Sequence, residues 1–252
     1  MFFNAPCQTK VSEVFNCTTT LCVCALAAIE IKATNKVNSK VFFIVIFFTK
    51  LQILQMKAMW NERYQADEYQ YGIDPNDFMK EQITPLPTGR ILFPGAGEGR
   101  DAVFAAKKGW EVHAFDLSEQ GKAKAEKLAS AEKTRIHYKV ADATLVKFPL
   151  ESFDVIALTY FHLPLETRLH FYKQCISWLK PGGLLILEGF NQRQLGLSSG
   201  GPKNADWLFS SETIAAEFPG LKIILNEEKQ RKLNEGLLHQ GLAEVVQLVG
   251  QK

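Results

Sequence analysis

Short apolar runs alternate with longer amphipathic segments through the middle of this 252-residue chain. Each run is followed by a turn and then by a segment with apolar residues at helical spacing. Strands that alternate with helices of about 10–15 residues predict a parallel sheet with helices on both faces, an α/β fold. The expected strands are Ile91–Phe93, Glu111–Phe115, about Ile136–Val140, Phe153–Thr159 and Leu184–Glu188.

The helices expected between these strands carry recognisable start and stop signals. One covers Asp101–Lys108, a second runs from an N-cap at Ser118 to about Ala131, and a third covers Leu165–Leu179. A serine at the N-cap can accept hydrogen bonds from the first free backbone N–H groups of a helix. Pro181-Gly182-Gly183 is expected to form a tight turn into the last of the five strands.

The C-terminal part of the chain has a different pattern. Leu221–Leu225 and Gly241–Val249 are predicted strands, and a charged stretch that we expect to be solvated, Glu227–Glu235, connects them. No helix is expected between these two strands, so they are predicted to pair antiparallel at one edge of the sheet.

Residues 1–56 differ from the rest of the chain. Their two apolar runs, Leu21–Ile29 and Val41–Phe48, are each less than half of the roughly 20 residues that a membrane-spanning helix needs. The segment between Ile31 and Met56 is rich in Phe, Ile, Asn and Lys, like translated intergenic DNA. Our leading hypothesis is therefore a non-native or disordered extension, with residues 57–252 as the folded domain; a membrane anchor is the alternative.

Charge and cysteine content exclude several classes of protein. The formal net charge is +2, and residues 1–56 hold five basic and two acidic residues, which leaves the remainder at −1. A near-neutral domain disfavours nucleic acid as a partner. Four of the five cysteines lie in the first 24 residues, so Cys175 stands alone in the domain. We therefore expect a reduced, cytoplasmic protein without a metal site. We also expect the protein to be a monomer.

A glycine-rich stretch follows the first strand of the predicted sheet. Pro94-Gly95-Ala96-Gly97-Glu98-Gly99 separates that strand from a helix, a junction that presents free N–H groups and a positive dipole end to a ligand. The dinucleotide fingerprint G-x-G-x-x-G would require glycine where Arg100 stands. The G-x-G-x-G spacing that is present is associated with S-adenosylmethionine (SAM) rather than NAD.

Ligands of doubly wound sheets bind beyond the carboxyl ends of the strands. Asp116 follows the second strand, where a carboxylate can accept both hydroxyls of a ribose, and Asp142 follows the third, near an adenine amino group. Either residue alone would more simply be a helix cap or a solvated turn. Thr159, Tyr160 and His162 follow the fourth strand, where a methyl acceptor would lie.

These motifs resemble those of the class I SAM-dependent methyltransferases. The resemblance rests on Ile91–Gly99, Asp116, Asp142, Phe153–Ile156 and Leu179–Gly183, in the order and spacing of that family. Trp60-x-x-Arg63-Tyr64, followed by Tyr71-Gly72 and Pro75-Asn76, looks like the start of the tellurite-resistance and thiopurine S-methyltransferase-like group. The resemblance implies a Rossmann-like, seven-stranded, mostly parallel sheet with an antiparallel strand near the C-terminus.

The resemblance also implies the residues that contact the cofactor. Trp60 and Tyr71 would cover it from the N-terminal segment, and the glycines would hold its methionine portion. The full set of cofactor residues expected is Trp60, Tyr71, Pro94, Gly95, Ala96, Gly97, Glu98, Gly99, Asp116, Leu117, Ala141, Asp142, Ala143 and Thr159. One departure is Phe93, where the family usually has an acidic residue near the SAM amino group. Glu98 or a backbone carbonyl could substitute; Glu98 could equally serve only the helix dipole.

The expected activity is methyl transfer to a small molecule, since no basic stripe or recognition domain is present. A soft nucleophile (a thiol, a thiopurine or a tellurium or selenium oxyanion) needs little help, whereas a hydroxyl or amine needs a base. Tyr160 and His162 are the candidates for a base; the alternative is that they are pocket wall and helix cap. The other functions considered are a non-catalytic SAM-binding regulatory domain, a methyltransferase for macromolecules and a nicotinamide oxidoreductase.

Three other histidines and two glycine-containing motifs are not assigned to the site. His113, His137 and His170 are expected to be structural. Glu235-Gly236-x-x-His239 either faces the pocket or makes a hairpin contact, and Gly200-Gly201-Pro202-Lys203 is either a substrate lid or a plain loop.

Overall fold

The computed structural model describes residues 39–252, with side chains described from residue 51. The chain divides into two compact units, Met1–Gln55 and Met56–Lys252. Helix α2 (Ser39–Tyr64) ends in the second unit, which contains everything described below. Among the described residues, none of the helices has both the length and the apolar character to cross a membrane. The apolar run Leu21–Ile29 lies outside the described residues, whereas residues 39–56 belong to α2. The hypothesis that residues 1–56 are a non-native or disordered extension stays a prediction.

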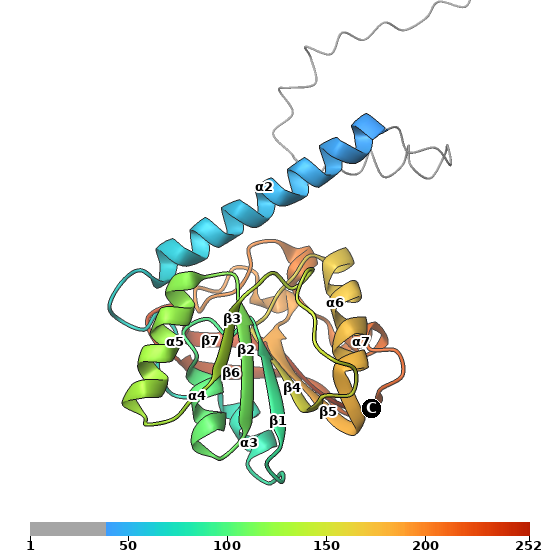
Figure 1. The fold of residues 1–252 in the computed structure, drawn as a ribbon. Coiled ribbons are helices and arrows are strands. Elements are labelled where there is room, and N and C mark those ends of the chain that lie inside the picture. The colour runs from blue at the N-terminus through green and yellow to red at the C-terminus, as the bar shows by residue number, and fades with distance from the viewer. Residues whose placement is uncertain (1–38) are drawn as a thin grey trace, which may run out of the picture. The chain divides into compact units, whose positions relative to one another are not determined.

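A seven-stranded sheet in the order β3-β2-β1-β4-β5-β7-β6 forms the centre of the second unit (Figure 1). Strands β1 to β5 are parallel, and β7 is antiparallel to both of its neighbours. The strands are β1 (Arg90–Pro94), β2 (Glu111–Asp116), β3 (His137–Val140), β4 (Phe153–Thr159), β5 (Leu179–Phe190), β6 (Lys222–Asn234) and β7 (Gln240–Gln251). The predicted α/β fold with an antiparallel strand near the C-terminus is confirmed.

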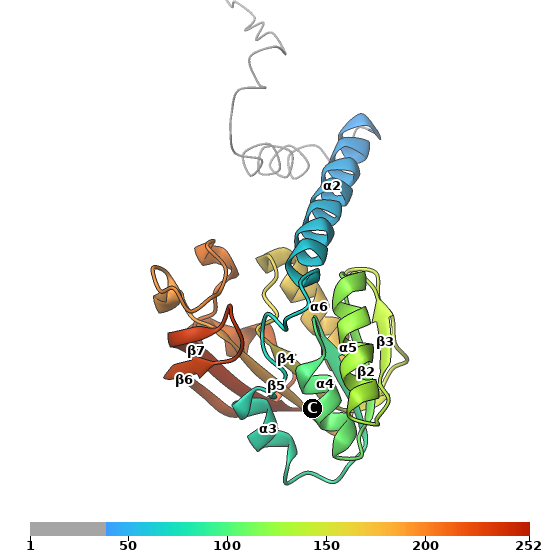
Figure 2. The same cartoon turned by 90° about the vertical axis from the view of Figure 1, so that its left-hand side faces the viewer.

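Helices cover both faces of this sheet (Figures 1 and 2). One layer holds α3 (Asp77–Ile83), α4 (Arg100–Lys107) and α5 (Glu119–Ala131); the other holds α6 (Leu165–Trp178) and α7 (Ser211–Ile214). Single-turn 3-10 helices follow β5 and flank α7, at Gln192–Gln194, Ala205–Trp207 and Ala215–Glu217. In β1, Ile91 and Phe93 pack toward the first layer and Leu92 toward the second. This alternation is the reason that a three-residue apolar run suffices to predict a strand buried on both faces.

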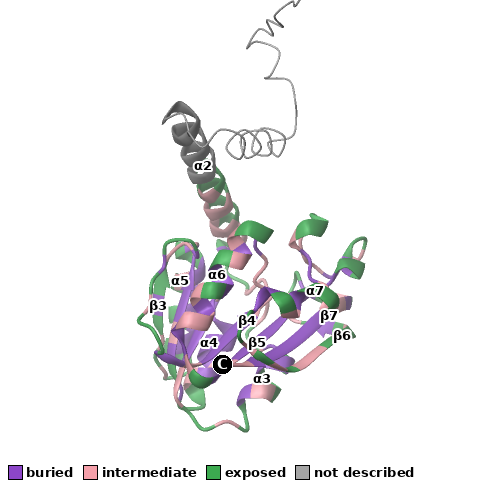
Figure 3. Cartoon of the chain, turned by 90° about the vertical axis from the view of Figure 1, so that its right-hand side faces the viewer, coloured by how far each residue is buried: buried purple, intermediate pink, exposed green. Residues whose placement is uncertain are grey.

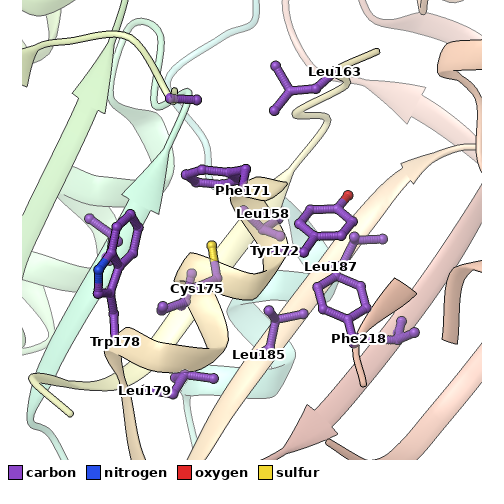
Figure 4. Close-up of a cluster of buried hydrophobic side chains, with 14 of the residues drawn as sticks. Leu158, Leu163, Phe171, Tyr172, Cys175, Trp178, Leu179, Leu185, Leu187 and Phe218 are labelled. Atoms are coloured by element: carbon purple, nitrogen blue, oxygen red, sulfur yellow. The ribbon is translucent and has the colours of Figure 1, made fainter. Parts of the chain in front are cut away.

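The core on the α6 side is largely aromatic (Figure 4). Tyr172 stacks on Phe218 with 4.2 Å between ring centroids, and Trp178 contacts Phe171 edge to face at 5.9 Å. Figure 3 shows that the sheet is the most buried part of the molecule, between helices whose outer faces are exposed. The carboxyl ends of the central strands are therefore held by a rigid scaffold.

Two expectations about the last strands were wrong. Pro181-Gly182-Gly183 lies inside β5 instead of forming a turn before it: four residues bulge opposite Asp154, between the pairs Phe153↔Leu179 and Val155↔Leu184. The charged stretch after Leu225 does not connect two strands but is the continuation of β6 to Asn234. Because β6 is an edge strand, its outer positions can be charged without breaking the pairing with β7.

Candidate cofactor and acceptor site

The glycine loop connects β1 to α4 at the carboxyl end of a central strand. The φ angles of Gly95, Gly97 and Gly99 are +60°, +50° and +86°, a region that residues with side chains rarely adopt. A Cβ at Gly99 would lie 2.5 Å from the Cβ of Ala125, so the third glycine allows α4 and α5 to pack closely. The positive end of the α4 dipole therefore lies directly beside the loop.

Two aromatic side chains pack on this loop. A Cβ at Gly95 would lie 2.2 Å from the ring of Phe161, and a Cβ at Gly97 would lie 2.7 Å from the Tyr64 hydroxyl. The hydroxyl of Tyr138 donates a 2.7 Å hydrogen bond to the carbonyl oxygen of Gly97. Positions 95 and 97 can therefore carry no side chain, because Phe161 and Tyr64 pack directly on the loop. We call residues 94–99 the glycine cradle.

Asp116 ends β2 beside the glycine loop. Its Oδ2 accepts a 3.1 Å hydrogen bond from the backbone N–H of Gly97, and its Oδ1 accepts a 2.9 Å bond from the N–H of Ser118. Burial raises the pKa of Asp116 to about 6, against the opposing effect of these backbone donors. Each carboxylate oxygen has a second lone pair that a ribose hydroxyl could use. Leu117, the next residue, is half-buried.

Asp142 lies next to Asp116 across the sheet edge, because the N–H of Ala141 donates to the carbonyl oxygen of Asp116 at 2.8 Å. Asp142 Oδ1 accepts hydrogen bonds from the N–H and the hydroxyl of Thr144. These bonds close a turn over residues 142–144. Its Oδ2 has no hydrogen-bond partner among the described residues. Ala143 is buried in the core on the α6 side, so of the three only Asp142 has a polar side chain to offer a ligand.

The end of α2 is fixed to the start of α5, next to Asp116. Asn61 Oδ1 accepts hydrogen bonds from the Ser118 hydroxyl at 2.7 Å and from the N–H of Gln120 at 3.2 Å. Trp60 stacks on Tyr64 with 5.5 Å between ring centroids. The two expected cofactor residues Trp60 and Tyr71 are bridged by Arg63, which lies 4.6 Å over the indole and donates a 2.9 Å bond to the Tyr71 hydroxyl.

Glu98 has protein partners that favour a structural role. Its two carboxylate oxygens accept hydrogen bonds of 3.1 Å from the N–H groups of Gln70 and Tyr71, and Lys124 Nζ lies 2.6 Å away. The side chain is 2% exposed. It anchors the 68–71 segment over α5 and is not free to bind the amino group of a cofactor. Phe93, at the position where the family usually has an acidic residue, is buried in the core. Among the described residues of this loop, no free carboxylate takes the place of that acidic residue.

Tyr160 leaves the end of β4 with a φ of +51°. Its hydroxyl donates a 2.9 Å hydrogen bond to Glu188 Oε1, on the adjacent strand β5. Asn76 also donates to this carboxylate at 2.7 Å, and Arg231 pairs with it. Burial, with the nearby charge of Glu188, raises the pKa of Tyr160 well above its ordinary value. Tyr160 is therefore a protonated, oriented wall residue; Thr159, before it, is half-buried at the strand end.

His162 does not fit the role of a base. Phe190 N–H donates to Nε2 at 3.1 Å, which assigns the proton to Nδ1, and Nδ1 lies 2.8 Å from the carbonyl oxygen of Trp207. Burial lowers the pKa of His162 to about 4. With both nitrogens bonded to the backbone, this ring joins β5 to the 205–207 turn and has no free lone pair for a substrate proton.

A buried polar cluster that was not predicted from the sequence lies behind Tyr160. Arg100, which we considered only as a missing glycine, pairs with Glu235 at 2.8 Å and donates a 3.1 Å bond to the carbonyl oxygen of Tyr71. Asp101 accepts a 2.7 Å bond from the N–H of Asn76. The Glu235-x-x-x-His239 pattern was the one signal of this cluster in the sequence.

The remaining histidines lie away from the site. His113 and His137 stack at 4.9 Å on adjacent strands, and with Glu111 they bring possible metal-ligand atoms within 4.8 Å of one another. Arg90 is bonded into this group, 3.0 Å from His113 Nε2 and 2.9 Å from Glu111 Oε1. A guanidinium at this distance opposes a divalent cation. His170 bonds to Gln174 on the surface of α6.

The 200–203 connection packs on the site. A Cβ at Gly200 would lie 2.7 Å from the ring of His239, and one at Gly201 would lie 2.9 Å from the ring of Phe190. The two glycines therefore contact the rings of the acceptor side directly.

The types of residue at this strand edge are those that would hold a SAM molecule. The glycine cradle would hold its methionine portion, Asp116 would accept hydrogen bonds from its ribose, and Asp142 Oδ2 would accept a bond from its adenine amino group. Trp60 and Tyr71 lie on the segment that would cover it.

Comparison with known proteins gives the family. Residues 91–183 match the family described as "Methyltransferase domain". Phosphoethanolamine N-methyltransferase 1 of Zea mays is 29% identical over 150 residues, which is 57% of this chain and 30% of the relative. Thiocyanate methyltransferase 1 of Arabidopsis thaliana is 36% identical over 104 residues, 40% of this chain and 46% of the relative. The matched segment thus spans less than half of the length of either relative.

Among solved structures, TehB from Haemophilus influenzae has a TM-score of 0.59 at 14% identity, covering 78% of this chain and 66% of that one. This likeness supports the fold found here. The match of residues 91–183, with relatives that are themselves named methyltransferases, shows that the chain belongs to the class I SAM-dependent methyltransferases, with S-adenosylmethionine as its cofactor.

Proposed function

We propose that this protein transfers a methyl group from SAM to a small molecule with a soft nucleophilic atom: a thiol, a thiopurine or a tellurium or selenium oxyanion. The observation that carries this proposal is the aromatic wall at the end of β4. Phe161 packs on Gly95, while Tyr160 lies 4.6 Å from Phe190 and 4.7 Å from His239 between ring centroids. Aromatic rings make favourable contacts with polarisable sulfur, which supports the thiol and thiopurine acceptors in particular.

The chemistry asks the chain mainly for alignment. Bound SAM supplies a methyl group on a positively charged sulfur, and its displacement requires the acceptor atom in line, about 3–3.5 Å from the methyl carbon. The glycine cradle and Asp116 would fix one reactant. Tyr160, oriented through Glu188, would fix the position of the other. Such positioning needs no charged catalytic group when the acceptor is already an anion.

The names of two similar proteins support a small acceptor. One is named for thiocyanate, a sulfur nucleophile, and the other is named for phosphoethanolamine. The near-neutral charge of residues 57–252 supports neither a nucleic-acid nor a strongly acidic partner. The tellurite-resistance and thiopurine-like group remains our preferred subfamily because of Trp60, Arg63 and Tyr64, whose side chains contact one another beside Asp116.

Calorimetry and a methyl-release screen test the proposal. Calorimetry with SAM, S-adenosylhomocysteine and NAD⁺ should give binding of the first two only. The screen then offers thiols, thiopurines, tellurite, selenite, thiocyanate and phosphoethanolamine. Methylation of phosphoethanolamine alone would overturn the soft-acceptor assignment. SAM binding without transfer to any acceptor or macromolecule would instead support the regulatory alternative.

A further inference from the structure

The loop between β6 and β7, residues 235–239, is docked on the segment that precedes α3. Leu238 N–H donates a 3.0 Å bond to the carbonyl oxygen of Gln70, and Glu235 N–H donates a 2.9 Å bond to that of His239. A Cβ at Gly236 would lie 2.2 Å from the backbone nitrogen of Gly72. This backbone-to-backbone packing fixes the position of the loop and of the side chains at its two ends.

The docked loop places His239 at the acceptor side of the site. Its ring lies 4.6 Å from Tyr71, 4.7 Å from Tyr160 and 5.4 Å from Phe190, measured between centroids. Tyr71 belongs to the segment that would cover the cofactor, and Tyr160 follows β4. The imidazole, 6% exposed, thus joins the two parts of the chain that would surround a methyl acceptor.

Glu235 determines which nitrogen of His239 is available. Glu235 Oε2 lies 3.4 Å from His239 Nδ1 and 2.8 Å from a terminal nitrogen of Arg100. Although burial opposes it, the hydrogen bond from His239 and the charge of Arg100 lower the pKa of Glu235 to about 2. A carboxylate facing Nδ1 favours the tautomer with the proton on Nδ1 and the lone pair on Nε2. Among residues 51–252, Nε2 of His239 has no hydrogen-bond partner, in contrast to His162.

We propose that His239, positioned by Glu235, receives the proton of the methyl acceptor when that acceptor binds in its protonated form. The proposal rests on the proposed function. Nε2 takes the proton while the lone pair of the acceptor forms the bond to the methyl carbon and the electrons of the C–S bond remain on sulfur. The products are the methylated acceptor, S-adenosylhomocysteine and the imidazolium of His239 beside Glu235. The imidazolium then loses its proton to water.

The surroundings of His239 act on its pKa in both directions. Burial lowers its pKa, Arg100 and Arg63 act in the same direction, and Glu235 opposes them. Tyr71 and Tyr160 face the ring with raised pKa values and are uncharged. His162, the other titratable group near it, is neutral as well. On balance these surroundings lower the pKa of His239 and favour its neutral form.

The decisive variant is His239→Gln, with His170→Gln on the exposed surface of α6 as the matched control. Affinity for S-adenosylhomocysteine should stay within about twofold of wild type in both. With a thiol that is protonated at neutral pH, His239→Gln should lower kcat about 100-fold or more and remove the rising limb of the pH profile. With a selenolate or a thiol ionised at pH 7, the loss should be at most about threefold.

A second readout does not depend on turnover. In ¹⁵N spectra of the free protein, His239 should show a protonated Nδ1 and an unprotonated Nε2, and Glu235→Gln should weaken this preference. A protonated Nε2, or an unchanged pH profile in His239→Gln while wild type is active, would overturn the role of His239 alone. Absence of methyl transfer by wild type to every acceptor would overturn the proposed function, and this role with it.

Discussion

The side chains of Arg100 and Glu235 form a buried ion pair, although 135 positions separate them in the chain. The two side chains are 9% and 10% exposed, and 2.8 Å separates the charged atoms. Arg100 opens α4 directly after the glycine loop, and Glu235 follows the end of β6. The pair therefore ties the C-terminal hairpin to the element that begins the cofactor cradle.

Removal of one partner should destabilise the fold strongly. In Arg100→Met, the buried carboxylates of Glu235 and Asp101 would both lose Arg100, and Glu235 would keep only the more distant Arg231, at 3.6 Å. Removal of one partner of a buried pair costs about 3–5 kcal/mol. We expect a loss of that size in the free energy of unfolding measured in urea. The control is Lys107→Met, on the same helix, whose pair with Glu132 is 47% and 38% exposed and should contribute less than about 1 kcal/mol. Equal losses in the two variants would contradict the account.

The sequence predicts strands and turns here better than it predicts which charges meet. The runs Phe153–Thr159 and Glu111–Phe115 are predicted to within a residue because apolar residues recur along each of them between polar or turn-forming segments. Arg100 and Glu235 come from distant segments, and no local pattern marks the ion pair between them. For the same reason the role expected for Glu98 gave way to a structural one, since its partners Gln70 and Lys124 are fixed only by the tertiary fold.

The glycine cradle gives a prediction with a matched control. Gly97→Ala adds a methyl group 2.7 Å from the Tyr64 hydroxyl at a φ of +50°, so it should displace Tyr64 and abolish measurable binding of S-adenosylhomocysteine. Gly220→Ala carries a similar backbone cost, at a φ of +92°, with nothing within 4 Å. It should lower stability by about 1–2 kcal/mol and leave binding unchanged. Calorimetry and urea unfolding on both variants separate the two effects.

Cofactor affinity should depend on pH through Asp116. Its folded-state pKa of about 6 means that it is mostly ionised at pH 7 and mostly protonated at pH 5. The carboxylate is the form that accepts hydrogen bonds from a ribose, so affinity should fall as pH decreases through about 6. Asp116→Asn should bind S-adenosylhomocysteine more weakly at pH 7 and show little change between pH 7 and 5. If the affinity of the wild type does not change between pH 7 and 5, Asp116 does not bind the ribose.

Trp60 should contribute to cofactor affinity by orienting its neighbours. Its indole stacks on Tyr64, the residue that lies over Gly97, and supports Arg63, which holds the Tyr71 hydroxyl. Trp60→Ala removes both contacts, each worth about 0.5–1.5 kcal/mol. Affinity for S-adenosylhomocysteine should fall about tenfold, which corresponds to about 1.4 kcal/mol. Met59→Ala, a neighbouring residue on the same helix that is 42% exposed, should bind like wild type. Equal affinities of the two variants would show that Trp60 lies outside the cofactor site.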